Sequence, residues 1–406
     1  MPQASGLFRK VAFKRESAYG TMPATTLWTL ARRVRSTIDV EKDTFMSKEI
    51  RSSMMVSDER HGARRAKGQL QGEVTPGAHS ELWQAILKRD FTAGVSIALA
   101  ATTLAIAGSG PTYTLTRSAG SWITDGIKLH DVVRITVGAG LTPANLNKNL
   151  MVVALTATVM SVIVLNQSTL ATDAATATCT VAVTGKKTFI PQTGHTDQSF
   201  AFEHWQEDVA LNEVYTGIKF SKASINLPPD DMATFTMDVL GQTMVPAGAR
   251  YSTTWNPANT KGPAAAPSGA LCMGGALVAI ITGAQLDVSP GFSGGPVVGS
   301  VLVPALFAKT VVVGGQFTAY FQDATLRDMF LNETEGSMAL ALTSNLDANS
   351  DFVQLALPRI KTMSASKPDN DGELVQTIRF TSLENMAGGS GQTTEATAIS
   401  MQDSAA

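Results

Sequence analysis

The chain has 406 residues, which is long enough for two or three domains. Its formal net charge is −2, and only 16% of its residues are charged, whereas 44% are hydrophobic. So few charges indicate that part of the surface is covered by other copies of the same chain. With only two cysteines, Cys179 and Cys272, a disulfide framework and a multi-cysteine zinc site are excluded.

Charge is unevenly distributed along the chain. Residues 1–72 carry 14 Lys and Arg against 7 Asp and Glu, whereas residues 323–406 carry 5 against 12. Opposite charges at the two ends favour head-to-tail contacts between copies. The first residues lack the apolar core of a secretion signal, and no apolar segment is long enough for a membrane-spanning helix. We therefore expect assembly in the cytoplasm and no membrane insertion.

Most of the chain is predicted to be β-structure. Segments with alternating apolar and polar residues are separated by Gly, Pro, Asn and Asp, which is the pattern of short strands joined by turns. Apart from residues 102–188, the strand-like segments are 66–74, 199–205, 232–241, 314–321, 337–343, 352–361 and 374–383.

Two short segments have helical periodicity instead. In residues 80–87, Ser80 is a predicted N-cap, and the apolar side chains from Leu82 to Leu87 recur on one face. Residues 323–331 show the same pattern after Asp323.

The two helices occupy matching places in an internal repeat. "SSMMV" at residue 52 matches "GSVLV" at 299, and "GQLQGEV" at 68 matches "GQFTAYF" at 315, both with an offset of 247. Further along, "GIKFSKASINLPPDD" aligns with "LPRIKTMSASKPDND" at an offset of 139. That alignment matches Lys222 to Lys361 and Pro229-Asp230 to Pro368-Asp369. The chain is therefore predicted to contain two copies of one unit.

The offset between matched segments falls from 247 to 139 along the chain. The first copy therefore contains an insertion of about a hundred residues. Residues 101–188 are rich in Thr, Ala and Val with strand-like alternation, which predicts an inserted small β-barrel on a surface loop. The domains are then residues 1–100 with 189–255 for the first unit, 101–188 for the insert, 256–270 for a linker rich in Pro, Gly and Ala, and 271–406 for the second unit.

One motif suggests an enzyme. Residues 291–296, Gly-Phe-Ser-Gly-Gly-Pro, resemble the nucleophile turn of chymotrypsin-like serine proteases. None of the five histidines has the sequence setting of a catalytic base in that family, and Phe292 replaces the acidic residue usual before the serine. In the first repeat the same place holds Asp43-Thr44-Phe45-Met46, which has no nucleophile. We therefore interpret this segment as a flexible loop and assign no catalytic residue.

No cofactor or metal site is predicted either. The basic cluster from Arg60 to Lys67 lacks interleaved aromatic residues, so an exposed or interface loop is the simpler interpretation. His204 and Glu203 would point to opposite sides of a strand, which argues against chelation. Neither "PPDD" nor "KPDND" has enough ligands for a calcium loop.

The segments "KRESAYGTMP", "KGQLQGEVTPGAHSELWQAIL", "VYTGIKFSKASINLPPDDMATFTMDVLG", "GGQFTAYFQDATLRDMFLN" and "LPRIKTMSASKPDNDGELVQTIRF" resemble the major tail tube proteins of long-tailed, siphovirus-like bacteriophages. The resemblance implies a β-sandwich with a flanking helix, whose strands join those of neighbours into a continuous barrel around a lumen. Stacked rings would form the tube that carries double-stranded DNA. It further implies a virion protein that contacts the tail terminator, tape measure and distal tail proteins.

The repeat refines the expected oligomer. Rings of single-unit relatives have six members, so a chain with two units is expected to form a trimeric ring with pseudo-sixfold symmetry and an outward-projecting insert. A hexamer remains the alternative.

The same resemblance implies contacts between rings. The loop at 39–53 and its repeat partner at 287–300 correspond to the loops that join rings in the family, and a basic N-terminal arm is expected to meet the acidic C-terminal part of an adjacent ring. The stacking candidates are Asp39, Lys42, Asp43, Phe45, Lys48, Asp287, Gly291, Phe292, Ser293 and Pro296, and the arm candidates are Arg9, Lys10, Lys14 and Arg15.

A rival interpretation is a tail component that binds carbohydrate or a host surface through the insert. It depends on exposed aromatic residues, and the insert offers Tyr113 and Trp122. We interpret Trp122 as a core residue of the insert, which makes this alternative the weaker one.

Overall fold

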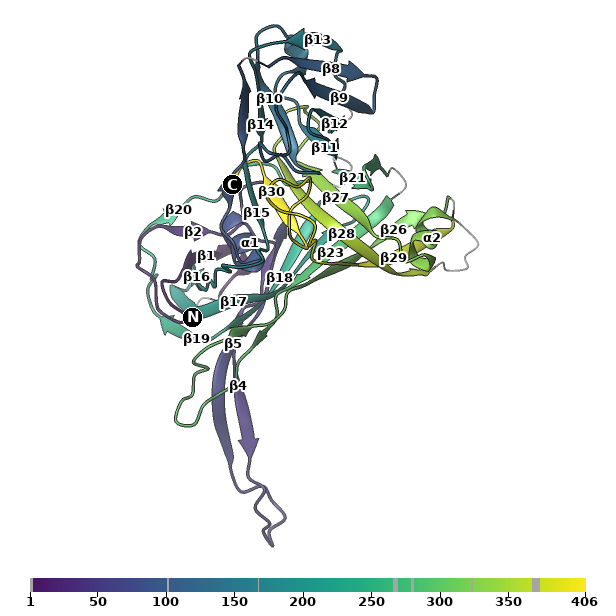
Figure 1. The fold of residues 1–406 in the computed structure, drawn as a ribbon. Coiled ribbons are helices and arrows are strands. Elements are labelled where there is room, and N and C mark those ends of the chain that lie inside the picture. Colours follow the sequence, from purple (N-terminus) through teal and green to yellow (C-terminus); the bar gives the residue numbers. More distant parts are fainter. Residues whose placement is uncertain are drawn as a thin grey trace.

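The structure is a computed structural model that describes residues 3–100, 102–166, 168–265, 269–278, 281–322, 324–366 and 373–406. Asp323 and Pro368-Asp369, which the sequence assigned to a helix cap and to the repeat, lie outside these residues. Strands dominate the described part of the chain, and two short α-helices accompany them (Figure 1). The predicted mainly β fold is confirmed.

In the first unit, strands form a sheet in the order β4, β5, β18, β17. They adopt this structure because apolar and polar residues alternate: in β18, Phe235, Met237 and Val239 are buried and the residues between them are half-buried. A short strand, β3, precedes β4 along the same side of β5. The bounds are β3 (Arg35–Ser36), β4 (Asp39–Met46), β5 (Glu59–Glu73), β17 (Leu211–Leu227) and β18 (Thr234–Gly241).

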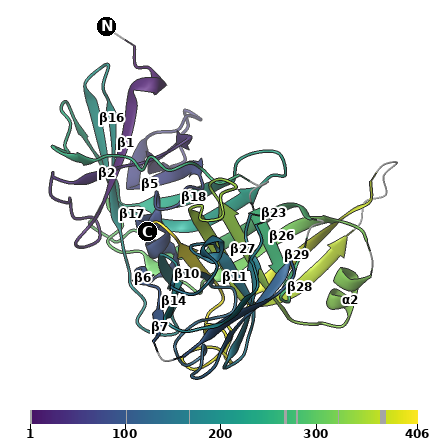
Figure 2. The same cartoon turned by 90° about the horizontal axis from the view of Figure 1, so that it is seen from above.

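The second unit repeats this order as β23, β26, β29, β28. The two units join where β17 pairs antiparallel with β23, with Ala223 opposite Val288 and Leu227 opposite Ala284. One continuous sheet, here called the shared sheet, therefore crosses both units (Figure 2). The bounds are β23 (Ile281–Ser289), β26 (Val312–Tyr320), β28 (Phe352–Ser366) and β29 (Val375–Ser382).

Matching bulges identify equivalent residues in the two units. β17 bulges at Ser221 where it pairs with β18, and β28 bulges at Met363 where it pairs with β29. These positions differ by 363 − 221 = 142, so Lys361 corresponds to Lys219. The alignment that matched Lys361 to Lys222 was wrong by three residues, because the low identity of the two segments did not reveal the position of the bulge in either strand.

A second layer covers the apolar face of the shared sheet, and one hydrophobic core extends through both units. The first halves of β17 and β28 belong to this outer layer and their second halves to the shared sheet, so each long strand links the layers. The outer strands are β1 (Arg9–Arg15), β2 (Trp28–Leu30), β6 (Thr92–Ala93), β15 (Lys186–Phe189), β16 (Phe200–Gln206), β19 (Thr243–Ala247), β20 (Trp255–Asn256), β21 (Gly269–Met273), β22 (Ala276–Leu277), β27 (Gly336–Thr343) and β30 (Ser400–Asp403).

The two predicted helices are α1 (Ser80–Leu87) and α2 (Thr325–Leu331). In α1, Leu82, Ile86 and Leu87 enter the core, as their spacing predicts. The predicted N-cap is wrong by one residue: His79 precedes the helix, and the Ser80 hydroxyl donates a hydrogen bond to Asp403 at 3.3 Å. The Ser80 side chain therefore contacts the C-terminal strand and does not cap its own helix.

The insert is an eight-stranded sheet wrapped around its own apolar core, which includes fully buried Trp122. Its strand order is β13-β8-β9-β12-β11-β10-β14-β7, and β13 and β7 are unjoined ends, so the predicted barrel is an open sheet. The strands are β7 (Ser96–Leu99), β8 (Leu104–Gly108), β9 (Thr112–Arg117), β10 (Val132–Gly138), β11 (Leu150–Leu155), β12 (Val159–Val164), β13 (Asp173–Thr176) and β14 (Cys179–Val183).

The insert is docked firmly on the second unit rather than hanging from a loop (Figure 1). A separate apolar cluster joins β10, β11 and β12 to β21, β27 and β28. The side-chain amide of Gln402 accepts from the Val132 N–H at 2.9 Å and donates to the carbonyls of Val132 and Thr184. Lys187 forms ion pairs with buried Asp131 and with Glu395. The insertion therefore ties the first repeat's chain to the second unit.

Acid should weaken the fold through His79. This side chain packs against Phe235, its ring nitrogen bonds the carbonyl of Arg32 at 2.9 Å, and burial lowers its pKa from 6.5 to about 4. Between these values the unfolded chain binds a proton that the folded chain does not, so the free energy of unfolding falls as pH falls, by about 1.4 kcal/mol per pH unit.

We expect His79→Gln to remove the part of this dependence that His79 contributes, while buried His130 and His204, whose pKa values burial also lowers, keep theirs. Between pH 7.5 and pH 5, the wild-type chain should lose about 2 kcal/mol more unfolding free energy than the variant does, measured by urea denaturation. Exposed His195 supplies the matched control, His195→Gln, which should behave like the wild type. An equal loss in wild type and His79→Gln would contradict the assignment.

Candidate assembly surfaces

The shared sheet has an unpaired edge at each end. At one end β4 pairs with β5, and at the other the residues of β28 after Ile360 pair with β29. Within the described ranges, no strand pairs with the outer side of either segment. Unpaired N–H and C=O groups along a sheet edge form a template for another strand. The molecule therefore offers two complementary places for β-pairing with another chain.

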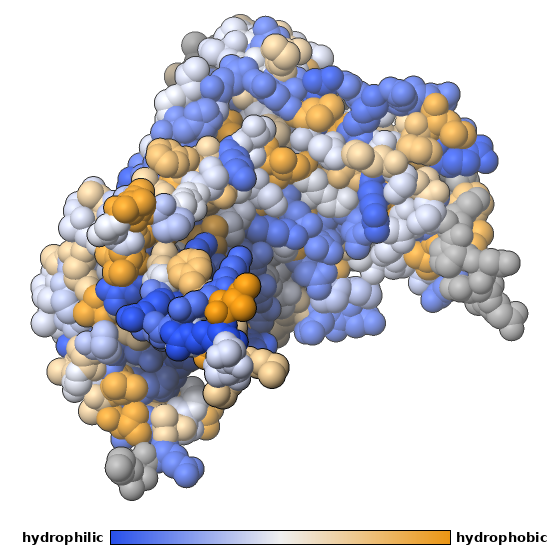
Figure 3. Space-filling view, turned by 90° about the horizontal axis from the view of Figure 1, so that it is seen from below, coloured by the Kyte–Doolittle hydropathy of each residue, from blue (hydrophilic) through white to orange (hydrophobic). Residues whose placement is uncertain are grey.

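The second surface is the polar face of the shared sheet, whose other face packs on the core. It consists mainly of Gln, Thr and Ser side chains. Seen from below (Figure 3), the molecule is arched, and hydrophilic side chains gather around the projecting hairpin and within the arch. Residues of this face include Gln69, Gln71, Lys222, Ser224, Asn226, Thr234, Thr236, Asp238, Gln285, Asp287, Gln316, Thr318, Thr377 and Arg379.

Three cations on this face are neutralised by carboxylates of the same chain. Lys67 pairs with Glu41 at 2.7 Å, Arg65 with Asp43 at 2.6 Å, and Lys222 with Asp287 at 3.4 Å. These exposed pairs add little stability. Their consequence is electrostatic, because a cation held by a carboxylate has less attraction for a passing anion.

The third surface is the β4–β5 hairpin, which projects from the end opposite the insert (Figure 1). Its tip, residues 47–58, contains Lys48 and carries exposed apolar side chains among charged and serine side chains. Ile50 is 99% exposed, Met54 96% and Met55 70%. Asp39, Lys42, Asp43 and Phe45 lie in β4 itself rather than in a loop. Exposed apolar side chains gathered at one tip indicate a contact with another molecule.

The equivalent loop of the second unit is folded back on its own chain. The bounds of its two strands are β24 (Phe292–Ser293) and β25 (Phe307–Ala308), and they pair with each other. The Phe292 ring contacts the Lys88 ammonium at 4.5 Å from its centroid, and the carbonyl of Leu306 accepts from Lys219 at 3.1 Å.

The predicted stacking residues of the second unit are accordingly divided. Asp287 lies in β23, within the junction between the units, whereas Gly291 and Pro296 belong to the folded-back loop. Gly291 has a φ of 55°, which favours glycine there. The two repeat loops therefore differ in conformation, and their contact with another ring stays a prediction.

The four basic residues assigned to an arm all lie on β1, with partners in their own chain. Arg9 contacts His204 and Glu213, Lys10 pairs with Glu207 at 2.7 Å, Lys14 donates to the carbonyls of Ala24 and Thr26, and Arg15 pairs with Asp90 at 3.5 Å. A contact of this strand with an adjacent ring also stays a prediction.

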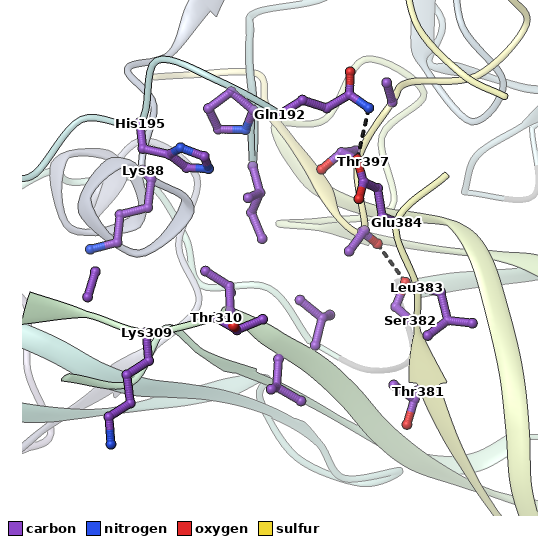
Figure 4. A pocket seen from close by; sticks show the side chains of 18 residues that line it. Lys88, Gln192, His195, Lys309, Thr310, Thr381, Ser382, Leu383, Glu384 and Thr397 are labelled. Atoms are coloured by element: carbon purple, nitrogen blue, oxygen red, sulfur yellow. Dashed lines mark hydrogen bonds between the residues drawn. The ribbon is translucent and has the colours of Figure 1, made fainter. Parts of the chain in front are cut away.

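The protease-like motif has no catalytic setting. Ser293 pairs with Phe307, and no hydrogen bond joins it to a histidine within the described ranges. A nearby pocket of about 690 Å³ contains His195 (Figure 4). Its polar groups bond each other: Gln192 donates to Glu384 at 2.8 Å, and Ser382 donates to the carbonyl of Ala398 at 2.6 Å.

Two further expectations concern ligands and membranes. Tyr113 is 3% exposed and Trp122 fully buried, so the aromatic residues considered for carbohydrate binding belong to the core of the insert. Over the described residues, no cluster of His, Cys, Asp and Glu has the geometry to hold a metal ion. In the same part of the chain, neither helix has the length and apolar character needed to cross a membrane.

These surfaces are the parts of the chain that are exposed for contact with other molecules. The comparison with protein families agrees: phage tail tube proteins match residues 9–384. The chain belongs to this family of structural tail proteins. No curated protein matches the sequence.

Sequence reasoning interpreted residues 39–53 as a loop, although residues 39–46 form β4, and it identified neither which strands form the sheet edges nor the charge pairing. One signal was present. Asp39-Val40 and Asp287-Val288 are the same dipeptide, and both lie on a strand of the shared sheet, at the start of β4 and near the end of β23. The pairing of Lys67 with Glu41 had no sequence signal, because it depends on strand register.

The hairpin tip should act in association and leave the fold unchanged. Replacing Ile50, Met54 and Met55 with Ser should alter the free energy of unfolding by less than about 0.5 kcal/mol, because these side chains are exposed. The same variant should assemble into long tubes poorly, as measured by sedimentation and electron microscopy. Val137→Ser, an exposed position in the insert, is the matched control. Normal tube lengths in the triple variant would contradict a stacking role.

Proposed function

We propose that the protein polymerises into stacked rings that form a phage tail tube, through which double-stranded DNA passes into the host. The observation that carries this proposal is the shared sheet, in which two equivalent units are already joined by β17 and β23. A sheet that extends by the same step at each junction can close on itself, and closure removes every unpaired edge.

Three copies are the expected number in each ring. Each chain supplies two equivalent units to the sheet, and rings of single-unit relatives are expected to have six members. Closed cyclic symmetry is the usual arrangement for such homo-oligomers. Three chains with two units each would then occupy the same circumference, with the insert on the outer layer of every second unit.

The polar face of the shared sheet is the proposed lumen surface. Binding to DNA depends mainly on Lys and Arg that neutralise phosphates, and each such contact adds affinity. On this face Lys67, Arg65 and Lys222 are held by carboxylates, whereas exposed Arg379 forms no ion pair within the described residues. Such a surface favours passage of DNA over retention.

Stacking and the ends of the tube complete the proposed function. The apolar hairpin tip is the candidate contact with the next ring, and tail terminator, tape measure and distal tail proteins are the expected partners where the tube ends. The protein would be assembled in the host bacterial cytoplasm and reside in the virion as part of a siphovirus-like tail.

Rings of the purified protein test the copy number. Class averages of end-on views should show three copies per ring, with three inserts at the periphery and six similar units around the hole. Mass photometry of single rings gives an independent count. Six full-length copies per ring would overturn the trimer and favour the hexamer.

Removing the carboxylates of the polar face should make rings hold DNA. In a variant with Glu41→Gln, Asp43→Asn and Asp287→Asn, three cations lose their partners, so binding of a short duplex should strengthen and become more salt-dependent, with a slope of about −0.9 per added phosphate contact. Fluorescence anisotropy between low and moderate salt measures this change.

The matched control removes carboxylates from ion pairs of the outer layer. Glu207→Gln frees Lys10 and Asp90→Asn frees Arg15, and this variant should bind DNA as weakly as the wild type. Equal gains in both variants would argue against a lumen on the polar face.

A further inference from the structure

The junction between the two units has a defined register and defined side-chain contacts. Ala223 lies opposite Val288, and Ser224 lies opposite Asp287. The Ser224 hydroxyl donates a hydrogen bond to the Asp287 carboxylate at 2.5 Å. Ala223 and Val288 are both buried, at 1% and 2% exposure. This is a complete interface between two copies of the repeated unit, held within one chain.

Residues equivalent to the first side of this junction lie on β28. Because β17 and β28 bulge at positions 142 residues apart, Ala223 corresponds to Ala365 and Ser224 to Ser366. The neighbouring strands agree: Ala223 pairs with Met237 and Ala365 with Ile378, which are buried at the same depth of the sheet.

Residues equivalent to the second side lie at the start of β4. Asp287 and Val288 pair with Gly314 and Val313 of β26. Asp39 and Val40 pair in the same way with Lys67 and Ala66 of β5. Since "GQ" at residue 68 and "GQ" at 315 place β5 and β26 in register, Asp287 corresponds to Asp39 and Val288 to Val40.

These four equivalent residues lack the cover that the internal junction provides. Ala365 and Val40 are half-buried, whereas their counterparts Ala223 and Val288 are fully buried. Ser366 and Asp39 are exposed, and the Asp39 carboxylate accepts the N–H of the adjacent Val40 at 2.7 Å. Each edge therefore carries the residues of one side of the internal junction, and within the described residues no strand faces them.

We propose that β28 of one copy pairs antiparallel with β4 of a second copy in the register of the internal junction. Ala365 lies opposite Val40, and Ser366 lies opposite Asp39 and donates its hydroxyl hydrogen bond to that carboxylate. The partner is a second copy of this chain, because the two edges carry the two halves of an interface that the chain already contains. The inference rests on the proposed ring and adds its residue contacts.

A disulfide test measures this register in the full-length protein. In the variant Asp39→Cys with Ser366→Cys, oxidation should join neighbouring chains into covalent rings on a non-reducing gel, because directly opposed Cβ atoms lie about 5 Å apart. The native thiols do not interfere: Cys179 and Cys272 are buried, and burial raises the pKa of Cys272 to about 12.

Two matched pairs calibrate the result. Ser224→Cys with Asp287→Cys has the same geometry inside one chain, so it should oxidise to within about twofold of the same extent without joining chains. Glu41→Cys with Ser366→Cys is shifted by two residues to a diagonal position about 7–8 Å away and should give about tenfold less product.

The outcomes separate the register from the ring. Efficient linkage of the 39–366 pair with little linkage of the 41–366 pair supports the proposal. If tubes form but the shifted pair links as well or better, the register is wrong and the proposed function stands. If the wild-type protein forms no rings under any assembly condition, both the register and the proposed function are overturned.

Discussion

The backbone N–H and C=O groups at the edges of a sheet need hydrogen-bonding partners, and this constraint determines how the strands of this structure are arranged. Every backbone N–H and C=O group that is withdrawn from water needs a partner, and a sheet that stops leaves a row of them. In this chain the first unit meets that demand on one side with the second unit, through β17 and β23. Among the described residues, no strand pairs with the outer side of β4 or with the outer side of β28 after Ile360, so the folded chain has two unpaired sheet edges.

The insert has a different physical role from the one its sequence position suggests. It leaves the chain within the first repeat, yet its apolar cluster and Gln402 bond it to strands of the second unit. The pairing of Lys187 with Glu395 adds an ion pair between the end of the insert and the second unit. The insert thereby connects the chain of the first repeat to strands of the second unit.

The sequence was sufficient for the mainly β fold class, because this depends on patterns many residues long. It failed where the correct assignment depends on the position of a single residue. The bulges at Ser221 and Met363 show that Lys361 corresponds to Lys219, and a bulge is set by strand pairing and has no sequence signal in these segments. Likewise, Ser80 has the composition of a cap, yet contact with Asp403 determines its hydrogen bond. The charge pairing on the polar face depends on register and could not be predicted from the order of residues.

Joining two units in one chain also changes how a ring is made. The connection through residues 256–270 makes the β17–β23 contact intramolecular, so its partners meet at a high effective concentration whatever the amount of protein present. In a ring of three chains, half of the contacts are then complete before any two molecules collide. Fewer collisions between molecules are needed to close the ring. Partial rings, whose unpaired sheet edges can pair with wrong chains, therefore exist for a shorter time.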